Sequence, residues 1–176
     1  MPGGLGVDRV ATARLVGRRP EEGDARAYVR VFTDPRIDEE AWPADRRTAD
    51  GARETLAAFI AHWERWGFGP WTVLVGSEPV GWTGLQHTRV DGRPEVELLW
   101  FLDGDLWGRG YAPELAREAV RVAFEVLELD DVVAFTTPAN TRSQAVMRRL
   151  GMAHERDIVH GGLPHVLFRL TRPGAV

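Results

Sequence analysis

The residues best placed for chemistry form a glycine loop between a strand pattern and a helix pattern. Gly108 and Gly110 flank Arg109 shortly after an apolar run that ends at Leu102, and a helical pattern begins at Ala112. Glycines let the backbone approach a ligand closely, and the first turn of a helix offers unpaired amides at the positive end of its dipole. The segment therefore predicts either a pyrophosphate-binding loop or a tight strand-to-helix turn that binds nothing.

A nicotinamide-dinucleotide site is the alternative that shares this loop. Asp130 and Asp131 follow the glycines at about the 20-residue spacing of that fingerprint. However, its third glycine position is Pro113, which has no amide to offer, and the preceding strand closes an antiparallel pattern instead of opening a parallel βαβ unit. An oxidoreductase on such a cofactor is therefore the disfavoured interpretation.

The residue types that are missing exclude several kinds of catalysis. The sequence contains no Cys and no Lys, so its 22 basic residues are all Arg. Schiff-base chemistry, thiolate nucleophiles, Cys-ligated zinc and iron–sulfur clusters are therefore excluded. The only serines, Ser77 and Ser143, lie outside any G-x-S-x-G pattern, and the five His show no HExxH spacing. We expect neither a serine hydrolase nor a metal site.

Length and charge bound the class of protein. The 176 residues, 44% apolar and 27% charged, fit one domain over 1–176, with an ordered part of about 12–171. The net charge of −4 argues against nucleic-acid or membrane partners. The first residues have no apolar signal core, and no run reaches the ~18 apolar residues of a membrane span. We therefore expect a cytoplasmic protein.

The elements that must position the loop give a mixed α/β pattern. Turn residues and alternation predict strands at 14–18, 71–75, 80–89, 95–102 and 132–136, and two more around Gly161 and Gly162. Helical spacing is found at 21–32, at 48–66, at 112–127 and at 143–150, with Thr48 as an N-cap and Gly67 as a stop. The expected fold is a largely antiparallel sheet of about seven strands flanked by about four helices.

Five short segments, in a fixed order, carry a family resemblance. They are Thr12–Leu15, Gly81–Leu85, Glu97–Ala112, Pro138–Ser143 and Leu150–Met152. Together they resemble the GNAT superfamily of acyl-CoA N-acyltransferases, most closely its RimJ/RimL-like branch of ribosomal-protein N-terminal acetyltransferases. The resemblance implies a sheet that splays between its fourth and fifth strands. It also implies acetyl transfer from acetyl-CoA to a primary amine, of a protein N-terminus or a small molecule; the alternative is a non-catalytic acyl-CoA-binding module. Dimers occur in this branch, so a homodimer is a further expectation.

The resemblance assigns the glycine loop to coenzyme A. It implies that the pyrophosphate of this co-substrate is held without a metal. The groups that hold it are the backbone amides of Arg109, Gly110, Tyr111 and Ala112. The loop residues concerned are Trp107, Gly108, Arg109, Gly110, Tyr111 and Ala112. Pro113 departs from the usual pattern and removes one amide, although its fixed φ suits a first helical turn.

The same resemblance places the pantetheine arm of coenzyme A. It implies that Phe101 and Leu102 pair with the arm through their backbone, as a peptide adds to a sheet edge. Asn140, the only Asn in the chain, matches a family position that hydrogen-bonds the arm, and it can also cap the following helix. Ser143 is counted with these coenzyme contacts.

Catalysis requires a base, because an α-amino group has a pKa of ~7.7–8.0 and a Lys amine ~10.4. Glu97 matches a Glu of the resembling branch and is expected to be this base, directly or through a water. The competing interpretation is a solvated strand carboxylate, with Glu95 on the same face. Ser143 is the remaining candidate to assist the leaving thiolate, or simply a helix-start residue, because Met147 stands where many members have Tyr. Without Cys or Lys, direct attack in a ternary complex is expected.

The acceptor cannot be derived from the sequence. Its pocket is expected to involve the stretch 34–47 and the Gly161–Gly162 connection, and neither has a readable code. His160 and His165 are candidates to line the acceptor cleft, although a surface or capping role is typical of such dispersed His.

Overall fold

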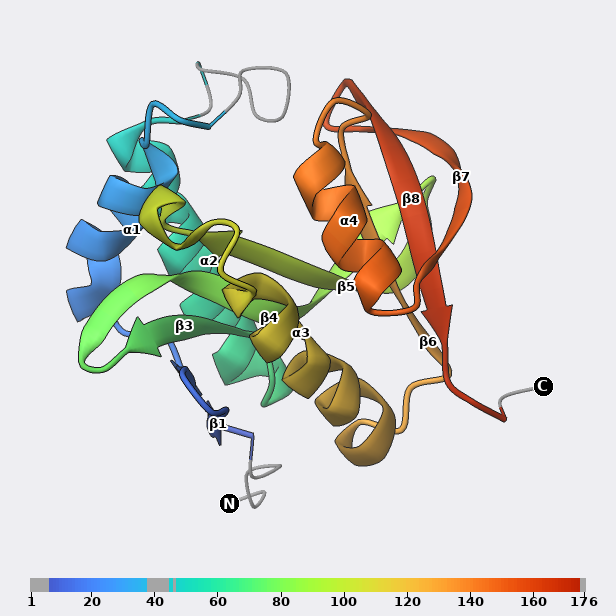
Figure 1. Cartoon of the computed structure of the whole chain (residues 1–176), viewed down its shortest axis with the longest axis horizontal. Coiled ribbons are helices and arrows are strands. Elements are labelled where there is room, and N and C mark those ends of the chain that lie inside the picture. Colours follow the sequence, from blue (N-terminus) through green and yellow to red (C-terminus); the bar gives the residue numbers. More distant parts are fainter. Residues whose placement is uncertain (1–6, 38–44, 46, 175–176) are drawn as a thin grey trace.

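The fold is built on eight strands and four α-helices in the computed structural model, which describes residues 7–37, 45 and 47–174 (Figure 1). The strands are β1 (Arg9–Ala11), β2 (Val16–Arg18), β3 (Pro70–Val75), β4 (Glu78–Val90), β5 (Arg93–Leu102), β6 (Asp131–Thr136), β7 (Ala153–His160) and β8 (Leu163–Thr171). The α-helices are α1 (Ala25–Phe32), α2 (Ala49–Trp66), α3 (Tyr111–Arg121) and α4 (Thr141–Arg149). Single turns of other helix types are η1 (Glu22–Asp24), η3 (Gly104–Leu106) and η4 (Val122–Val126), the last a π-helix.

The strands form one sheet in the order β1-β2-β3-β4-β5-β6-β8-β7. Every neighbouring pair is antiparallel except β5 and β6, which are parallel and share a single registered pair, Glu97 and Val133. Past this pair the two strands separate, and Figure 1 shows β5 running away from β6. This confirms the mixed, largely antiparallel fold and the splay between the fourth and fifth predicted strands. The strand beyond the seven expected is the edge strand β1, whose three residues are too few for a recognisable alternation.

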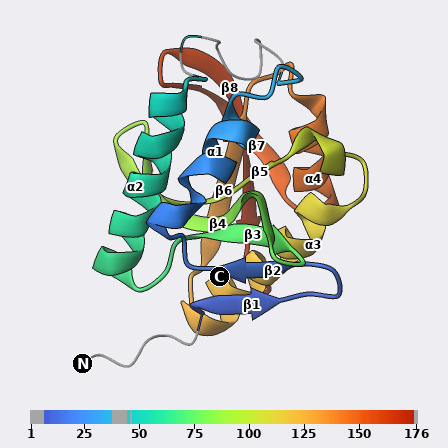
Figure 2. The ribbon, with the colours of Figure 1, turned by 90° about the vertical axis from the view of Figure 1, so that its left-hand side faces the viewer.

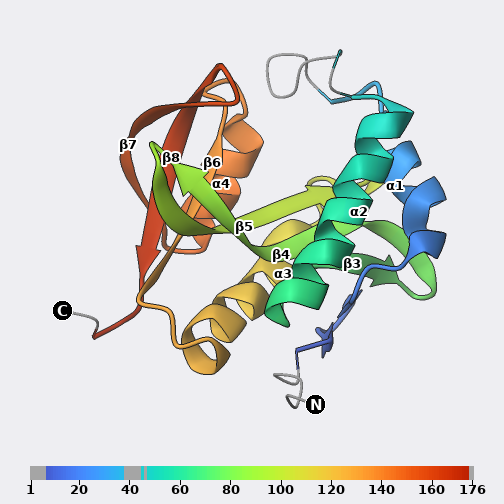
Figure 3. The same cartoon turned by 180° about the vertical axis from the view of Figure 1, so that it is seen from behind.

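Helices cover both faces of the sheet (Figures 2 and 3). Successive residues of a strand point to opposite faces, so β5 contributes to two cores. Leu98 and Leu102 pack in the core that contains residues of α3 and α4. Leu99 and Phe101 pack against Trp82 and the apolar sides of α1 and α2. The end of β5 is therefore fixed from both sides.

The helix boundaries follow from local chemistry. Thr48 Oγ1 accepts a hydrogen bond from Gly51 N at 3.0 Å, and α2 ends where Gly67 takes a φ of 71°. The helix expected at 21–32 begins as the 3-10 turn η1, closed by the side chains of Glu21 and Asp24, and continues as α1. The helix expected at 112–127 changes to π-helical hydrogen bonding after Arg121.

In the part of the chain that the structure describes, no helix is long and apolar enough to cross a membrane.

Candidate active site

The predicted glycine loop has the backbone geometry that only glycine adopts readily. Gly108 and Gly110 have φ angles of 75° and 76°, in the left-handed region. Gly110 is the N-cap of α3, and no side chain caps this helix start. A Cβ at Gly108 would meet no described atom within 4 Å. The loop therefore presents uncapped helix amides beside open space, which fits a bound phosphate group.

Arg14 and Glu114 fix this loop from the protein side. Arg14 Nη1 donates to the Arg109 carbonyl at 3.0 Å, and its guanidinium lies 4.3 Å from the centre of the Tyr111 ring. Arg14 also pairs with Glu114 at 2.6 Å, and Thr12 Oγ1 donates to the same carboxylate. Burial alone would raise the pKa of Glu114, but the hydrogen bonds from Thr12 and Arg14 outweigh burial and lower it. These roles of Arg14 and Glu114 have no local signal in the sequence, although Thr12–Leu15 is one of the segments that carry the resemblance.

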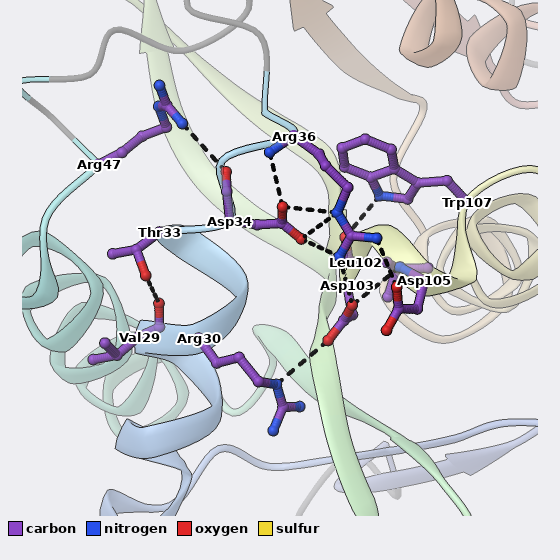
Figure 4. Close-up of polar contacts among 10 residues, drawn as sticks. All are labelled: Val29, Arg30, Thr33, Asp34, Arg36, Arg47, Leu102, Asp103, Asp105 and Trp107. Atoms are coloured by element: carbon purple, nitrogen blue, oxygen red, sulfur yellow. Dashed lines mark hydrogen bonds and ion pairs between the residues drawn. The ribbon is translucent and has the colours of Figure 1, made fainter.

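Trp107 joins the end of β5 to the start of α4. Its indole Nε1 donates to the Leu102 carbonyl at 2.8 Å (Figure 4). The Arg142 guanidinium lies 4.4 Å from the centre of the Trp107 ring, within the range of a cation–π contact. The side chain of Trp107 thus spans the opening between β5 and the segment that follows β6.

A second polar cluster ties the segment after α1 to the segment after β5 (Figure 4). Arg36 donates from Nε and Nη2 to the buried carboxylate of Asp34, and its Nη1 lies 2.6 Å from Asp105. Its Nη2 is also 3.5 Å from Asp103. The hydrogen bonds from Arg36 lower the pKa of Asp34. Of the stretch 34–47 that was predicted to shape the acceptor pocket, residues 38–44 and 46 lie outside the described residues.

The hydrogen-bond pattern of β4 and β5 shows which backbone groups face the opening. Asp103 N donates to Val80 O at 2.8 Å, next to the directly opposed residues Gly81 and Leu102. In an antiparallel ladder, hydrogen-bonded and non-hydrogen-bonded pairs alternate. The pair Gly81 and Leu102 is therefore a non-hydrogen-bonded pair, and Leu102 directs its amide and carbonyl away from β4.

By the same alternation, Trp100 also directs its backbone groups away from β4, whereas Phe101 directs its own toward β4. Beyond Glu97 no registered pair joins this edge of β5 to β6 among the described residues. The backbone of Trp100 and Leu102 is thus the stretch of β5 available to an added extended ligand, with the Leu102 carbonyl already accepting from Trp107.

Asn140 and Ser143 form one polar group at the start of α4. Asn140 Oδ1 accepts from Ser143 N at 3.1 Å, which is an N-cap, and Asn140 Nδ2 lies within hydrogen-bond distance of Thr136 Oγ1 and Ser143 Oγ. The capping role that the sequence allowed for Asn140 is therefore present. Met147, at the position where many relatives have Tyr, is buried in the core.

Glu97 lies at the last point where β5 and β6 are paired. Gln86, directly opposite on β4, donates from Nε2 to Glu97 Oε2 at 2.8 Å. Burial raises the pKa of Glu97 to about 7, and the hydrogen bond from Gln86 only partly opposes this. The side chain retains partial exposure. Glu97 can therefore exchange a proton near neutral pH, as a general base requires.

Glu95, the alternative carboxylate on this face, is committed elsewhere. It forms a two-pronged ion pair with Arg169, with distances of 2.9 and 3.0 Å. Arg169 in turn contacts Asp131 and Glu155.

Within the described part of the chain, hydrogen bonds join Glu97 to Gln86 and Ser143 to Asn140, and no hydrogen bond joins the Glu97 pair to the Ser143 pair. No cluster of three or more metal-ligating side chains occurs among residues 7–37, 45 and 47–174.

Comparison with known proteins identifies the family. A family model described as the acetyltransferase (GNAT) domain matches residues 14–153, and the chain belongs to this family. The structure resembles that of an acetyltransferase from Agrobacterium tumefaciens, with a TM-score of 0.76, 25% identity, and coverage of 93% of this chain and 94% of that one. It also resembles Mycobacterium smegmatis RimJ in complex with a CoA-disulfide, with a TM-score of 0.70, 19% identity, and coverage of 90% and 82%.

One curated relative shares a shorter region. The FsC-acetyl coenzyme A-N(2)-transacetylase of Aspergillus fumigatus is 38% identical over 94 residues, which are 50% of this chain. The match spans only 40% of that enzyme's own length.

Proposed function

We propose that the protein transfers an acetyl group from acetyl-CoA to a primary amine by direct attack in a ternary complex. Membership of the acetyltransferase (GNAT) family supports the acetyl donor. One observation carries the proposal. The start of α3 has no side-chain cap and follows Gly108 and Gly110, which both have left-handed backbone conformations. It lies near the open edge of β5, where Glu97, with a pKa raised to about 7, marks the last pairing with β6. Acetyl-CoA supplies a thioester that is already activated toward nitrogen nucleophiles.

The coenzyme side of the site is built mainly from backbone groups. We assign the pyrophosphate to the amides of Gly110, Tyr111 and Ala112 and to that of Arg109, which in this structure donates a long hydrogen bond to the Leu106 carbonyl at 3.4 Å. Trp107 and Gly108 complete the loop. Pro113 supplies no donor there, so the remaining amides must suffice. Arg14 keeps the loop in its binding conformation through the Arg109 carbonyl.

We assign the pantetheine arm to the open edge of β5. The family resemblance implies that the arm pairs with Phe101 and Leu102. The ladder alternation supports Leu102 together with Trp100, because their backbone groups point toward the opening. Asn140 retains its place beside the arm: its carbonyl oxygen caps α4, while its amide group lies between Thr136 and Ser143.

We assign Glu97 as the base that removes a proton from the acceptor amine, directly or through a water. Its pKa of about 7 lies close to that of an α-amino group, ~7.7–8.0, so proton transfer between them is nearly balanced. Ser143 is assigned to assist the departing thiolate by hydrogen bonding or as a relay, since Met147 offers no proton; its Oγ accepts from Asn140 Nδ2, which leaves the hydroxyl hydrogen for the thiolate. The sequence has no Cys or Lys nucleophile, and the proposed direct attack involves no acetyl-enzyme.

The proposed acceptor is a primary amine. The printed name of the Aspergillus fumigatus relative describes transfer from acetyl coenzyme A to an N(2) nitrogen, which supports nitrogen as the acceptor atom. The fold likeness to RimJ supports a RimJ/RimL-like architecture, and a protein N-terminus is one member of the acceptor class.

A coupled assay tests the proposed function. Free thiol released from acetyl-CoA is measured with and without a panel of primary amines, and coenzyme A binding is measured separately by calorimetry. We expect thiol release that requires an added amine. Binding of coenzyme A without release across the panel would instead indicate a non-catalytic acyl-CoA-binding module. Failure to bind coenzyme A would refute both interpretations.

A further inference from the structure

Three rings gather on the sheet face that carries Glu97. The Phe135 ring lies 4.6 Å from the centre of the His160 ring and 5.7 Å from that of His165, and the two imidazoles are 5.8 Å apart. Phe135, His160 and His165 are each half-buried. The small core beneath them consists only of strand residues. Figure 3 shows β6, β7 and β8 on this face with no helix over them.

The strand register places these rings next to Glu97. Val133 is the direct partner of Glu97, and Phe135 lies two residues further along β6, on the same face and toward the opening. One such repeat advances about 7 Å along a strand. An amine nitrogen beside Glu97 and a ring beside Phe135 can therefore belong to one small molecule with two methylene groups between them.

The charges on this face favour a cationic acceptor with an uncharged body. Among the ion pairs of the described residues, none includes Glu97, whereas Arg169 is taken up by Glu95, Asp131 and Glu155. A protonated amine therefore meets an available carboxylate, and a carboxylate or phosphate on the acceptor meets no available guanidinium from Arg169.

Two polar atoms near the rings are suited to a ligand. His165 Nδ1 lies 2.9 Å from the Leu163 carbonyl, which can only accept, so in the neutral ring Nδ1 carries the proton and Nε2 is an acceptor. At the end of β6, Thr137 Oγ1 is buried without a hydrogen-bond partner in the described structure. Buried polar groups of this kind are normally satisfied.

We propose that the acceptor is a small arylalkylamine, whose ring packs against Phe135, His160 and His165 while its amine reaches Glu97. This inference rests on the proposed acetyl transfer and names the substrate class of the same site. In the reaction, the amine nitrogen forms a bond to the acetyl carbonyl carbon and the carbon–sulfur bond breaks. Glu97 takes one proton from the bound ammonium group before the attack, and a second proton of the attacking nitrogen passes to the departing sulfur, so the coenzyme leaves as its free thiol.

The test compares three acceptors with acetyl-CoA at saturation: 2-phenylethylamine, n-butylamine and a short peptide with an N-terminal Ser. We expect kcat/KM for 2-phenylethylamine to exceed that for n-butylamine by about tenfold or more, because burial of the ring adds apolar contact. Equal values for the two amines would overturn the inference and leave acetyl transfer intact. Activity with the peptide alone would do the same.

A pair of matched variants locates the ring contact. Phe135→Leu keeps an apolar side chain but removes the aromatic contact, so KM for 2-phenylethylamine should rise about three- to tenfold. KM for n-butylamine should change less, because this amine has no ring to lose the aromatic contact, and the affinity for coenzyme A should stay unchanged. Phe124→Leu is the control, because Phe124 is also half-buried but packs in the core with α3. Equal effects of the two substitutions would show that the Phe135 contact is only structural and would overturn the inference. Absence of coenzyme A binding by the wild-type protein would remove the proposed function itself.

Discussion

In the proposed site, the coenzyme side and the acceptor side use different parts of the polypeptide. The coenzyme side presents backbone groups, from Gly108 to Ala112 and along the edge of β5, which Arg14 and Trp107 hold in place. The acceptor side acts through side chains, chiefly Glu97 and the rings around Phe135. A backbone site depends on conformation and tolerates many side chains, whereas a side-chain site changes its specificity with each substitution. The two sides should therefore respond differently to mutation.

The largest expected effect is on the acceptor side. Glu97→Gln keeps the shape of the side chain and an oxygen that can accept from Gln86, but it removes the base. We expect kcat to fall by about 10²- to 10⁴-fold with coenzyme A affinity unchanged. Steady-state kinetics and calorimetry measure the two quantities.

Glu95→Gln is the informative companion variant. It breaks the ion pair with Arg169, so it should lower thermal stability more than kcat. A loss of kcat as large as that of Glu97→Gln would mean that the face needs both carboxylates and that the assignment of a single base is wrong.

The next effect is on the coenzyme side. Gly110→Ala forces a residue with a Cβ into a φ of 76°, which costs about 1–2 kcal/mol for a left-handed conformation. The loop can relieve this strain only by leaving its binding conformation, so we expect coenzyme A affinity to fall about tenfold. Isothermal calorimetry measures it, and kcat at saturating acetyl-CoA should change little.

Gly92→Ala is the control for Gly110→Ala. Gly92 has a φ of 77° in the turn between β4 and β5, and a Cβ there meets nothing within 4 Å. Both substitutions should lower the melting temperature, and only Gly110→Ala should weaken coenzyme A binding. If both leave binding unchanged, the loop amides are not the pyrophosphate site.

The same contrast explains what the sequence could predict. Turn glycines and the caps at Thr48 and Asn140 depend on neighbours a few residues away, so the order of strand, glycine loop and helix and most helix ends could be predicted. Contacts between distant segments have no local signal. Glu114 lies 100 residues from Arg14, and Arg169 lies 74 residues from Glu95.

For this reason the sequence left Glu95 and Glu97 as alternatives and gave no role to Arg36. The strand β1 was missed because three residues that pair only with β2 carry too little alternation to recognise. The choice between Phe101 and Trp100 depends on the hydrogen-bond alternation of the ladder, which follows from register and not from residue type.

The pH dependence of activity should differ from the pH dependence of coenzyme A binding. Since the carboxylate form of Glu97 is the proposed base, activity should rise as pH increases through about 7, because a pKa of about 7 leaves only about one-tenth of Glu97 ionised at pH 6. The acceptor amine also loses protons as pH rises, so the ratio of wild-type to Glu97→Gln activity is the quantity to measure. This ratio should rise about tenfold from pH 6 to a plateau above pH 8. Coenzyme A binding to the loop amides should not follow it, and a flat ratio would remove Glu97 as the base.

Stability should change with pH in the opposite direction. The pKa of Glu97 is higher in the folded protein than its ordinary value of 4.5, so between these values the folded state binds more protons than the unfolded state. The contribution of Glu97 to the free energy of unfolding is therefore favourable at low pH and is lost as pH rises through about 7. Glu97→Gln should gain thermal stability relative to wild type at pH 8 and not at pH 4. Equal melting-temperature differences at the two pH values would contradict the raised pKa.

The smallest effect should come from the residue that links the two sides. Arg36 binds Asp34 after α1 and Asp105 after β5, but its side chain is half exposed, so solvent screens these ion pairs. Arg36→Gln should raise KM for the amine about two- to fivefold, because the segment after α1 loses its tether. Coenzyme A affinity should stay unchanged, since the Arg14 and Glu114 contacts to the loop remain. Arg53→Gln, which removes an exposed ion pair with Asp50 within α2, is the control and should change neither constant. A parallel loss of coenzyme A affinity in Arg36→Gln would show that amine binding and coenzyme A binding are energetically coupled. The two sides would then differ in the groups they use, backbone or side chain, but would not respond to mutation independently.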